Sequence, residues 1–146
     1  MSQWSAAEPG VVQLPSGRRL RGHSLSRPLQ GEVANLTLVL AARSPAPQHA
    51  ETAFIRWPDF ALPLDRAGAL RLLHEAWERS DRERVAISCR GGRGRTGTAL
   101  ACVAVLDGLA PAAAISLVRR TYDRRAIETP WQKRYVATFV AAHSRT

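Results

Sequence analysis

Residues 84–106 read RVAISCRGGRGRTGTALACVAVL, and this stretch decides the fold. It opens with a short apolar run that predicts a buried strand over 84–88, followed by a glycine-rich loop. The loop leads into residues 96–107, which are apolar nearly all round and predict a helix in the protein interior. A strand, a glycine-rich loop and a helix in this order direct several backbone N–H groups at the positive end of the helix. The stretch therefore predicts an anion-binding site.

The loop also carries a thiol and a guanidinium. Cys89 opens it and Arg95 closes it, with five residues between them. The helix N-terminus, the N–H donors and the nearby arginines all favour the thiolate, which is the nucleophilic form of cysteine. Arg95 can bind two phosphoryl oxygens at once, most strongly as charge spreads over them in a transition state. These residues favour chemistry on a phosphate over binding alone.

The end of the loop separates it from a nucleotide-binding Walker A loop. That motif needs Gly-Lys-Ser/Thr, and the residues here are Gly94-Arg95-Thr96. We therefore expect no nucleotide hydrolysis, no metal ion and no cofactor.

An attacking thiolate needs a leaving group that is protonated from the opposite side. Asp59 is the candidate donor, because it ends a short strand in the proline-stiffened segment Trp57-Pro58-Asp59. The bulky neighbours Trp57 and Phe60 predict an apolar setting, which favours the neutral, proton-donating carboxyl. Asp59 alone would be an ordinary turn residue, and only Cys89 and Arg95 make it the candidate acid.

The rest of the chain predicts one α/β domain over 11–146, with a mainly parallel sheet covered on both faces. Residues 1–10 lack periodicity and are expected to form a loose tail. The other expected elements are a hairpin over 11–21, strands over 36–41 and 53–56, a loop over 44–48, a helix over 66–79 capped by Asp65, a helix over 111–121 and a last helix from Thr129-Pro130 to about Ala142.

The amino-acid composition limits which binding partners and which cellular location are expected. The net charge is +9, and Lys133 is the only lysine. This arginine excess suits a phosphorylated partner, and compositional bias explains it equally well. No window holds 18 uninterrupted apolar residues and no signal peptide is recognisable, so we expect a cytoplasmic protein without a membrane span. Two cysteines make no disulfide framework, and Cys102 is expected to be an inert core residue.

The pattern Cys89-x5-Arg95-Thr96-Gly97 with an upstream Trp57-Pro58-Asp59 resembles the cysteine-dependent protein tyrosine phosphatase superfamily. The short length and the acid-to-cysteine spacing are similar to the dual-specificity group, and Trp-Pro-Asp is more similar to the tyrosine-specific enzymes. The resemblance implies that Cys89 forms a phosphocysteine, Arg95 binds phosphate and Asp59 acts as general acid, then as base. It also implies that the Thr96 hydroxyl assists breakdown of the intermediate. The phosphate-binding loop would comprise Arg90, Gly91, Gly92, Arg93, Gly94 and Arg95.

Two further positions bear on the resemblance. Residues 127–132 resemble the family's late glutamine-bearing segment, which implies that Gln132 positions the hydrolytic water. Thr129-x-x-Gln132 is equally a capping box, in which Gln132 reaches back to the helix start. Ser88 departs from the family, which usually has histidine before the cysteine, and this removes one group that stabilises the thiolate.

The expected function is hydrolysis of phosphate monoesters, foremost phosphotyrosine in proteins and also phosphoserine or phosphothreonine. A phosphoinositide or an RNA 5′-phosphate is an alternative substrate, since no aromatic segment that would sandwich phosphotyrosine is recognisable upstream. A non-catalytic phosphate-binding module is a further alternative. A nucleic-acid binder rests on net charge alone, so no specific nucleic acid is expected. We expect a monomer whose partner is a phosphorylated protein or another anionic phosphate.

Overall fold

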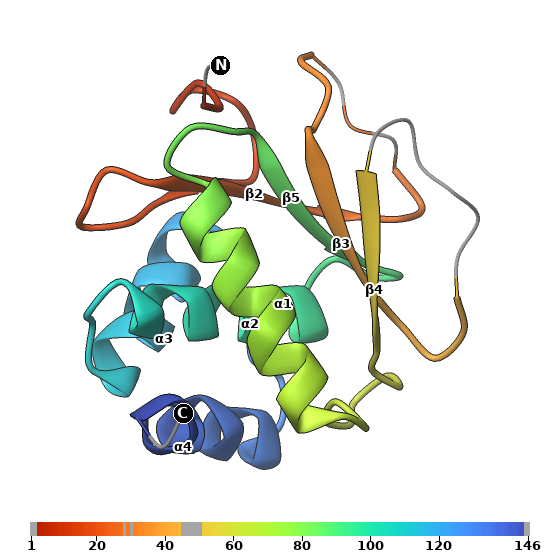
Figure 1. Ribbon diagram of the computed structural model, residues 1–146, viewed down its shortest axis with the longest axis vertical. Helices are drawn as coiled ribbons and strands as arrows, with labels where there is room; N and C mark the ends of the chain where they lie inside the picture. The colour runs from red at the N-terminus through yellow and green to blue at the C-terminus, as the bar shows by residue number, and fades with distance from the viewer. Residues whose placement is uncertain (1–2, 28, 30, 45–50, 145–146) are drawn as a thin grey trace.

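The computed structural model describes residues 3–27, 29, 31–44 and 51–144. A five-stranded sheet in the order β1-β2-β5-β3-β4 lies at its centre (Figure 1). The strands are β1 Val11–Gln13, β2 Arg19–Ser24, β3 Leu36–Ala41, β4 Glu51–Arg56 and β5 Val85–Cys89. β1 runs antiparallel to β2, and the other three pairings are parallel. The predicted α/β fold with a mainly parallel sheet and an N-terminal hairpin is confirmed.

The position of β5 explains its apolar sequence. It lies between β2 and β3, and all five of its residues are buried. The strand ends one residue later than predicted, because Cys89 still pairs with Ser24 on one side and Leu40 on the other. The cysteine is therefore part of the sheet, and the loop begins directly after it.

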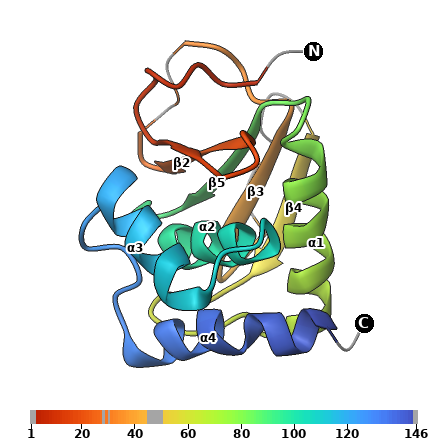
Figure 2. The same ribbon diagram turned by 90° about the vertical axis from the view of Figure 1, so that its left-hand side faces the viewer.

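Four helices follow the predicted order. They are α1 Arg66–Arg79, α2 Gly94–Leu106, α3 Pro111–Thr121 and α4 Pro130–Ser144. Asp65 caps α1 as predicted, since its side chain accepts a hydrogen bond from the Gly68 N–H. α2 begins two residues earlier than predicted, because the Gly97 N–H already bonds to the Arg93 carbonyl at 2.8 Å. Figure 2 shows α2 between α1 and α3, with α4 running below them.

The main core lies between the helices and one face of the sheet. Side chains alternate along a strand, so every second residue of β3 and β5 faces the helices. α2 is buried along almost its whole length and contacts the other three helices. The residues of β3 and β5 in this core are Leu36, Leu38, Leu40, Val85, Ile87 and Cys89. Cys102 of α2 belongs to the same core, as predicted.

The other face of the sheet is covered by the N-terminal segment, which the sequence predicted to be a loose tail. Trp4 is fully buried and packs with Ala34 and Ala86 in a second small cluster. Its indole N–H donates to the Val85 carbonyl at 2.9 Å. The helices pack on one face only, so the second face needs other apolar cover, and Trp4 provides it. The prediction of a tail is thus wrong for residues 3–10, while Met1 and Ser2 lie outside the described residues.

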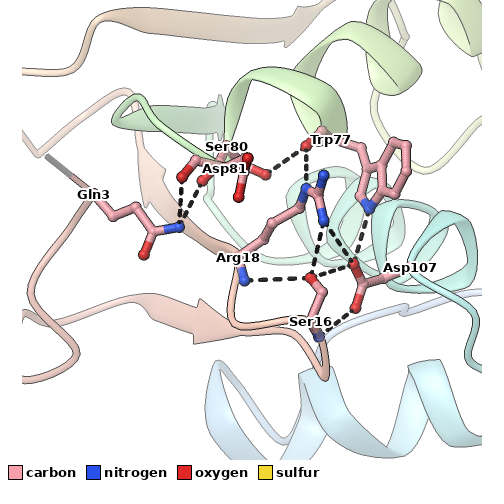
Figure 3. Close-up of polar contacts among 7 residues, drawn as sticks. All are labelled: Gln3, Ser16, Arg18, Trp77, Ser80, Asp81 and Asp107. Carbon is pink, nitrogen blue, oxygen red and sulfur yellow. Dashed lines mark hydrogen bonds and ion pairs between the residues drawn. The ribbon is translucent and has the colours of Figure 1, made fainter. Parts of the chain in front are cut away.

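A polar network joins the hairpin to the far end of α2 (Figure 3). Asp107, directly after α2, accepts hydrogen bonds from the Ser16 hydroxyl at 2.6 Å and the Trp77 indole at 2.9 Å. The Arg18 guanidinium stacks on the Trp77 ring at 4.4 Å, and its Nε donates to the Trp77 carbonyl at 3.0 Å. Gln3 donates to the carbonyls of Ser80 and Asp81 in the same region. The bonds to Asp107 hold the C-terminal end of α2, the helix whose N-terminus forms the site described below.

The sequence also predicted a loop over 44–48 and no membrane-spanning helix. Residues 45–48 of the loop predicted over 44–48 lie outside the described residues. No helix in the described part of the chain is both long and apolar enough to cross a bilayer.

Candidate active site

The loop between β5 and α2 folds around the cysteine sulfur. Cys89 is almost fully buried, and the Gly92 N–H donates to its Sγ at 3.1 Å. Gly92 has a φ of +69°, and a Cβ there would lie 2.6 Å from the backbone N of Ser24. Only glycine satisfies both the left-handed backbone and this close approach. The loop therefore keeps a backbone N–H donor beside the sulfur.

Contacts from outside hold the loop carbonyls away from the centre. The Leu25 N–H donates to the Cys89 carbonyl at 2.9 Å, and the Ser24 hydroxyl donates to the Arg90 carbonyl at 2.6 Å. The Tyr122 hydroxyl donates to the Gly92 carbonyl. Burial raises the pKa of Tyr122, so its hydroxyl stays protonated and remains a donor. These bonds hold the carbonyls of Cys89, Arg90 and Gly92 outward, while the Gly92 N–H points inward at the sulfur, and inward N–H groups are what an anion site requires.

A cavity of about 270 Å³ opens above the loop. Its walls come from three segments: the Trp57–Phe60 region, the phosphate loop and the approach to α4. The lining residues are Asp59, Phe60, Cys89, Gly91, Arg93, Gly94, Arg95 and Glu128. The structure thus brings Cys89, Arg95 and Asp59 together at one cavity, although Asp59 is far from the other two in sequence.

Arg95 joins the loop to the Asp59 segment. It is only 5% exposed, and its Nη1 donates to the Trp57 carbonyl at 3.0 Å. Its Nε lies 3.5 Å from Asp59 Oδ1 and has no hydrogen-bond partner among the described residues. A buried guanidinium N–H without a partner beside an anion-binding loop is available to a phosphoryl oxygen.

The segment around Asp59 is anchored by Trp57. This tryptophan is fully buried, and its indole N–H donates to the Ala61 carbonyl at 2.8 Å. Asp59 itself lies at the tip of the segment with 57% of its side chain exposed, and its Oδ1 accepts the Phe60 N–H at 3.0 Å. The apolar setting predicted for this carboxyl is therefore wrong, because Trp57 points into the core and Phe60 is exposed. The carboxyl faces solvent, a backbone N–H and Arg95.

Gln132 and Thr96 are fully buried and do not line the cavity. The predicted capping box is confirmed: Thr129 Oγ1 accepts the Gln132 N–H at 3.2 Å, and Gln132 Oε1 accepts the Thr129 N–H at 3.1 Å. Gln132 Nε2 and Thr96 Oγ1 have no hydrogen-bond partner within the described part of the chain. Both are buried polar groups whose hydrogen bonds the described residues do not complete, and their roles in hydrolysis stay predictions.

The remaining predicted residues lie at the rim or behind the loop. Arg93 lines the cavity and pairs with Asp123 at 3.3 Å, while the exposed Arg90 does not line it. Ser88 is fully buried on the face of β5 opposite Cys89, since neighbouring strand residues point to opposite faces. Its register partner on β2 is His23, and burial lowers the pKa of His23 despite a hydrogen bond to the Ser24 carbonyl. His23 is therefore neutral at pH 7 and places no positive charge behind the loop.

Four residues at the site were not identified from the sequence: Ser24, Tyr122, Glu128 and Trp131. Ser24 and Tyr122 hold loop carbonyls, and the Trp131 indole N–H donates to the Phe60 carbonyl in the Asp59 segment. Glu128 lies in the segment 127–132 that the sequence identified because of Gln132. Its position in that segment is the sequence feature from which it could have been identified. No group of three or more His, Cys, Asp or Glu side chains is placed to hold a metal ion among the described residues.

Comparison with known proteins agrees with this geometry. Residues 40–142 match the family model of the Swiss Army Knife protein, DSP-PTPase phosphatase domain. An uncharacterized protein of Methanocaldococcus jannaschii is 31% identical over 99 residues, which cover 68% of this chain and 61% of that protein. The chain thus spans under two thirds of the length of this relative.

Solved structures of phosphatases share the fold. The active form of Tk-PTP superposes with a TM-score of 0.63 at 26% identity, covering 77% of this chain and 80% of that one. A kinase associated phosphatase gives 0.65 at 18% identity over 77% and 72% of the two chains. PTPMT1 in complex with PI(5)P gives 0.52 at 15% identity over 77% and 80%. The last two likenesses show the fold alone. With the family model spanning most of the chain, this protein belongs to the cysteine-dependent protein tyrosine phosphatase superfamily, as a phosphatase domain of the dual-specificity type.

Proposed function

We propose that this phosphatase domain hydrolyses phosphate monoesters through a phosphocysteine and that phosphotyrosine in proteins is its foremost substrate. One observation carries the proposal: Cys89, Arg95 and Asp59 line a single cavity above a loop whose Gly92 N–H points at the cysteine sulfur. A thiol nucleophile, a guanidinium that can bind two phosphoryl oxygens and a carboxyl that can transfer a proton are the groups that this reaction needs, and here they share one cavity.

In the first proposed step, the Cys89 thiolate attacks phosphorus. A bond forms between Sγ and phosphorus while the bond to the leaving oxygen breaks, and Asp59 gives its proton to that oxygen. The loop N–H groups and Arg95 bind the three remaining oxygens as charge spreads over them. The products of this step are a phosphocysteine and the free alcohol or phenol.

In the second step, water attacks the phosphocysteine. Asp59, now a carboxylate, takes a proton from the water as the bond between sulfur and phosphorus breaks, which releases inorganic phosphate and restores the thiolate. The unpartnered Gln132 Nε2 supports a role in holding the water, and the unpartnered Thr96 hydroxyl supports a role in assisting the departing sulfur.

Aromatic side chains at the cavity rim support a phosphotyrosine substrate. Phe60 lines the cavity and is 53% exposed, and Trp131, which bonds to its carbonyl, is 49% exposed. Exposed rings beside a phosphate site offer a flat apolar surface for the phenyl ring of the substrate. A phosphoinositide is the second candidate, since the fold is shared with a PTPMT1 complex of PI(5)P and the chain carries a net charge of +9.

Trapping the intermediate tests this proposal. In a chelator, the protein should turn over p-nitrophenyl phosphate, and acid quenching of labelled substrate should leave phosphate on Cys89. A phosphotyrosine peptide should then give a higher kcat/KM than a phosphoserine peptide, PI(5)P or an RNA 5′-triphosphate. Phosphate binding without turnover would instead identify a non-catalytic binding module, and a preference for PI(5)P would identify the second candidate.

The indole of Trp131 should hold the Asp59 segment over the cavity. Trp131→Phe keeps an aromatic ring, although a smaller one, and removes the N–H that bonds to the Phe60 carbonyl. A lost hydrogen bond is worth about 1 kcal/mol, so kcat for an aryl phosphate should fall roughly fivefold. Steady-state kinetics measure this, with a thermal melt to show that the fold is kept.

Leu64→Ala is the matched control, because Leu64 is an exposed apolar residue near the same segment and lines no part of the cavity. This variant should keep its kcat. If Trp131→Phe also kept its kcat, the segment would be held in place without the indole.

A further inference from the structure

Tyr122, the residue directly after α3, has a ring that lies against glycine backbone. A Cβ at Gly22 of β2 would lie 2.6 Å from the ring Cε1 and 2.9 Å from the hydroxyl oxygen of Tyr122. Its three nearest atoms would all belong to this tyrosine. Gly10, whose carbonyl accepts the Gly22 N–H at 2.9 Å, borders the same ring. Gly22 lies in a strand without a positive φ, so its backbone does not require glycine, and the space for the ring does.

The ring directs its hydroxyl to the phosphate loop, where it donates to the Gly92 carbonyl. This carbonyl and the Arg93 N–H belong to one planar peptide group, and no peptide bond among the described residues is cis. In a trans peptide group the C=O and the N–H point in opposite directions. With the carbonyl held toward Tyr122, the Arg93 N–H is turned the other way, toward the cavity that Arg93 lines.

The Gly92 carbonyl needs a partner from outside the loop. Glycine has no side chain that restricts rotation about its own backbone bonds, and Gly92 has a φ of +69°. Its N–H is fixed by Cys89 Sγ at 3.1 Å, while its carbonyl is fixed by Tyr122. A carbonyl that rotated into the cavity would turn its negative oxygen toward the phosphate, and the site would lose a donor at the same time.

A second contact keeps the end of α3 at the loop. The Arg93 Nε donates to Asp123 Oδ2 at 3.3 Å, and the Tyr122 N–H donates to the Val118 carbonyl at 2.8 Å, which ties Tyr122 to the last turn of the helix. Two successive residues after α3 therefore hold two successive residues of the loop. Removal of the Tyr122 hydroxyl alone leaves the ion pair of Arg93 in place, so it changes the direction of one peptide group without releasing the helix.

We propose that Tyr122 is a positioning residue for phosphate hydrolysis, because it sets the peptide group of residues 92–93 so that the Arg93 N–H donates to a phosphoryl oxygen. The inference rests on the proposed function, since it concerns the phosphate that Cys89 attacks. No proton moves to or from Tyr122, and its bond to the Gly92 carbonyl persists through both steps of the reaction.

Tyr122→Phe tests the proposal, because it keeps the ring and removes only the hydroxyl. The kcat/KM for p-nitrophenyl phosphate should fall about 10- to 100-fold, since a misdirected donor costs less than the 10²- to 10³-fold of a donor that is removed outright. The affinity for inorganic phosphate, measured by isothermal titration in the Cys89→Ser background, should fall about fivefold. A thermal melt shows whether the fold is kept.

Tyr135→Phe is the matched control. Tyr135 is the other tyrosine of the chain, and its ring packs in the core against Trp57 and Phe139. It makes no contact with the phosphate loop among the hydrogen bonds of the described residues. This variant loses the same chemical group from a buried ring, and it should keep both kcat/KM and the affinity for phosphate.

Amide NMR separates a positioning role from a general loosening of the loop. When inorganic phosphate is added to the Cys89→Ser protein, the Arg93 and Gly94 amide resonances should both shift, because both residues line the cavity. With Tyr122→Phe added, the shift at Arg93 should be largely lost and the shift at Gly94, in the first turn of α2, should remain. An equal loss at both amides would mean that the hydroxyl only stabilises the loop as a whole.

Gly22→Ala approaches the same bond from the strand. Its methyl group would overlap the Tyr122 ring, so kcat/KM should fall about as much as in Tyr122→Phe. The change should add little to the Tyr122→Phe variant, where the hydroxyl bond is already absent. If the two losses multiplied, Gly22 would act on the strand alone, and its link to the loop through Tyr122 would be wrong.

These measurements keep the two proposals apart. If Tyr122→Phe kept its kcat/KM, its phosphate affinity and the Arg93 shift, only the inference about Tyr122 would fail. If the wild type bound phosphate without turning over an aryl phosphate, the proposed function would fail. The phosphate affinity and the Arg93 shift would then still decide whether Tyr122 positions the loop.

Discussion

Cys89→Ser should lose essentially all turnover of an aryl phosphate, by about 10⁵-fold in kcat, the scale seen when a catalytic nucleophile is removed. A serine hydroxyl is protonated at neutral pH and is a far weaker nucleophile than a thiolate. The change is nearly isosteric, and the sulfur is held at the end of β5 by strand pairing on both sides. The fold should therefore survive, and steady-state kinetics beside a circular dichroism spectrum measure the result.

Phosphate binding should persist in this variant. The loop carbonyls are held by the Leu25 N–H and by the hydroxyls of Ser24 and Tyr122, and none of these bonds involves the sulfur. Isothermal titration with inorganic phosphate should therefore give an affinity close to that of the wild type. A loss of both binding and turnover would mean that the thiol shapes the loop instead of attacking phosphorus.

The second cysteine is the matched control. Cys102 is fully buried in α2, and burial raises its pKa, which keeps the thiol protonated and inert. Cys102→Ala should keep its turnover even if it melts earlier, because the change only removes a core contact. Loss of turnover in a folded Cys102→Ala protein would assign this thiol a role that the geometry does not support.

The fold was predictable from the sequence where neighbouring residues alone specify a helix or a strand. The apolar run before Cys89, the Asp65 cap and Pro111 at a helix start each specify an element from neighbouring residues alone. The N-terminal segment was not predictable in this way. Trp4 is an isolated large apolar residue without a periodic pattern around it, and its burial depends on a bare sheet face that only the assembled fold creates.

The same distinction holds at the site. Cys89 and Arg95 share one loop, so their spacing alone brings them together. The positions of Tyr122, Trp131 and Glu128 at the site depend on how α3 and α4 approach the loop, which no local pattern encodes. The surroundings of Asp59 were wrongly predicted for a related reason: bulky neighbours in sequence do not show which way each ring points.

Arg95→Lys should lower kcat by about 10³-fold and raise KM for an aryl phosphate. Lysine keeps the charge and a donor but cannot reproduce the planar fork that binds two oxygens at once. Removal of a single donor to a transition-state oxyanion costs about 10²- to 10³-fold. Arg82→Lys is the control, because Arg82 is exposed, lies near Asp81 and does not line the cavity. This variant should keep both kcat and KM.

Arg95 should also act on the Asp59 segment, and a double-mutant cycle can show this. Its Nη1 bonds to the Trp57 carbonyl at 3.0 Å, so lysine would release the segment that carries the acid. Asp59→Asn should then cost less in the Arg95→Lys background than in the wild type, because the acid is already displaced. If the two losses simply multiplied, Arg95 would bind phosphate without positioning Asp59. A double variant whose loss of kcat is smaller than the product of the two single losses would show that one guanidinium both binds the phosphate and positions the proton donor.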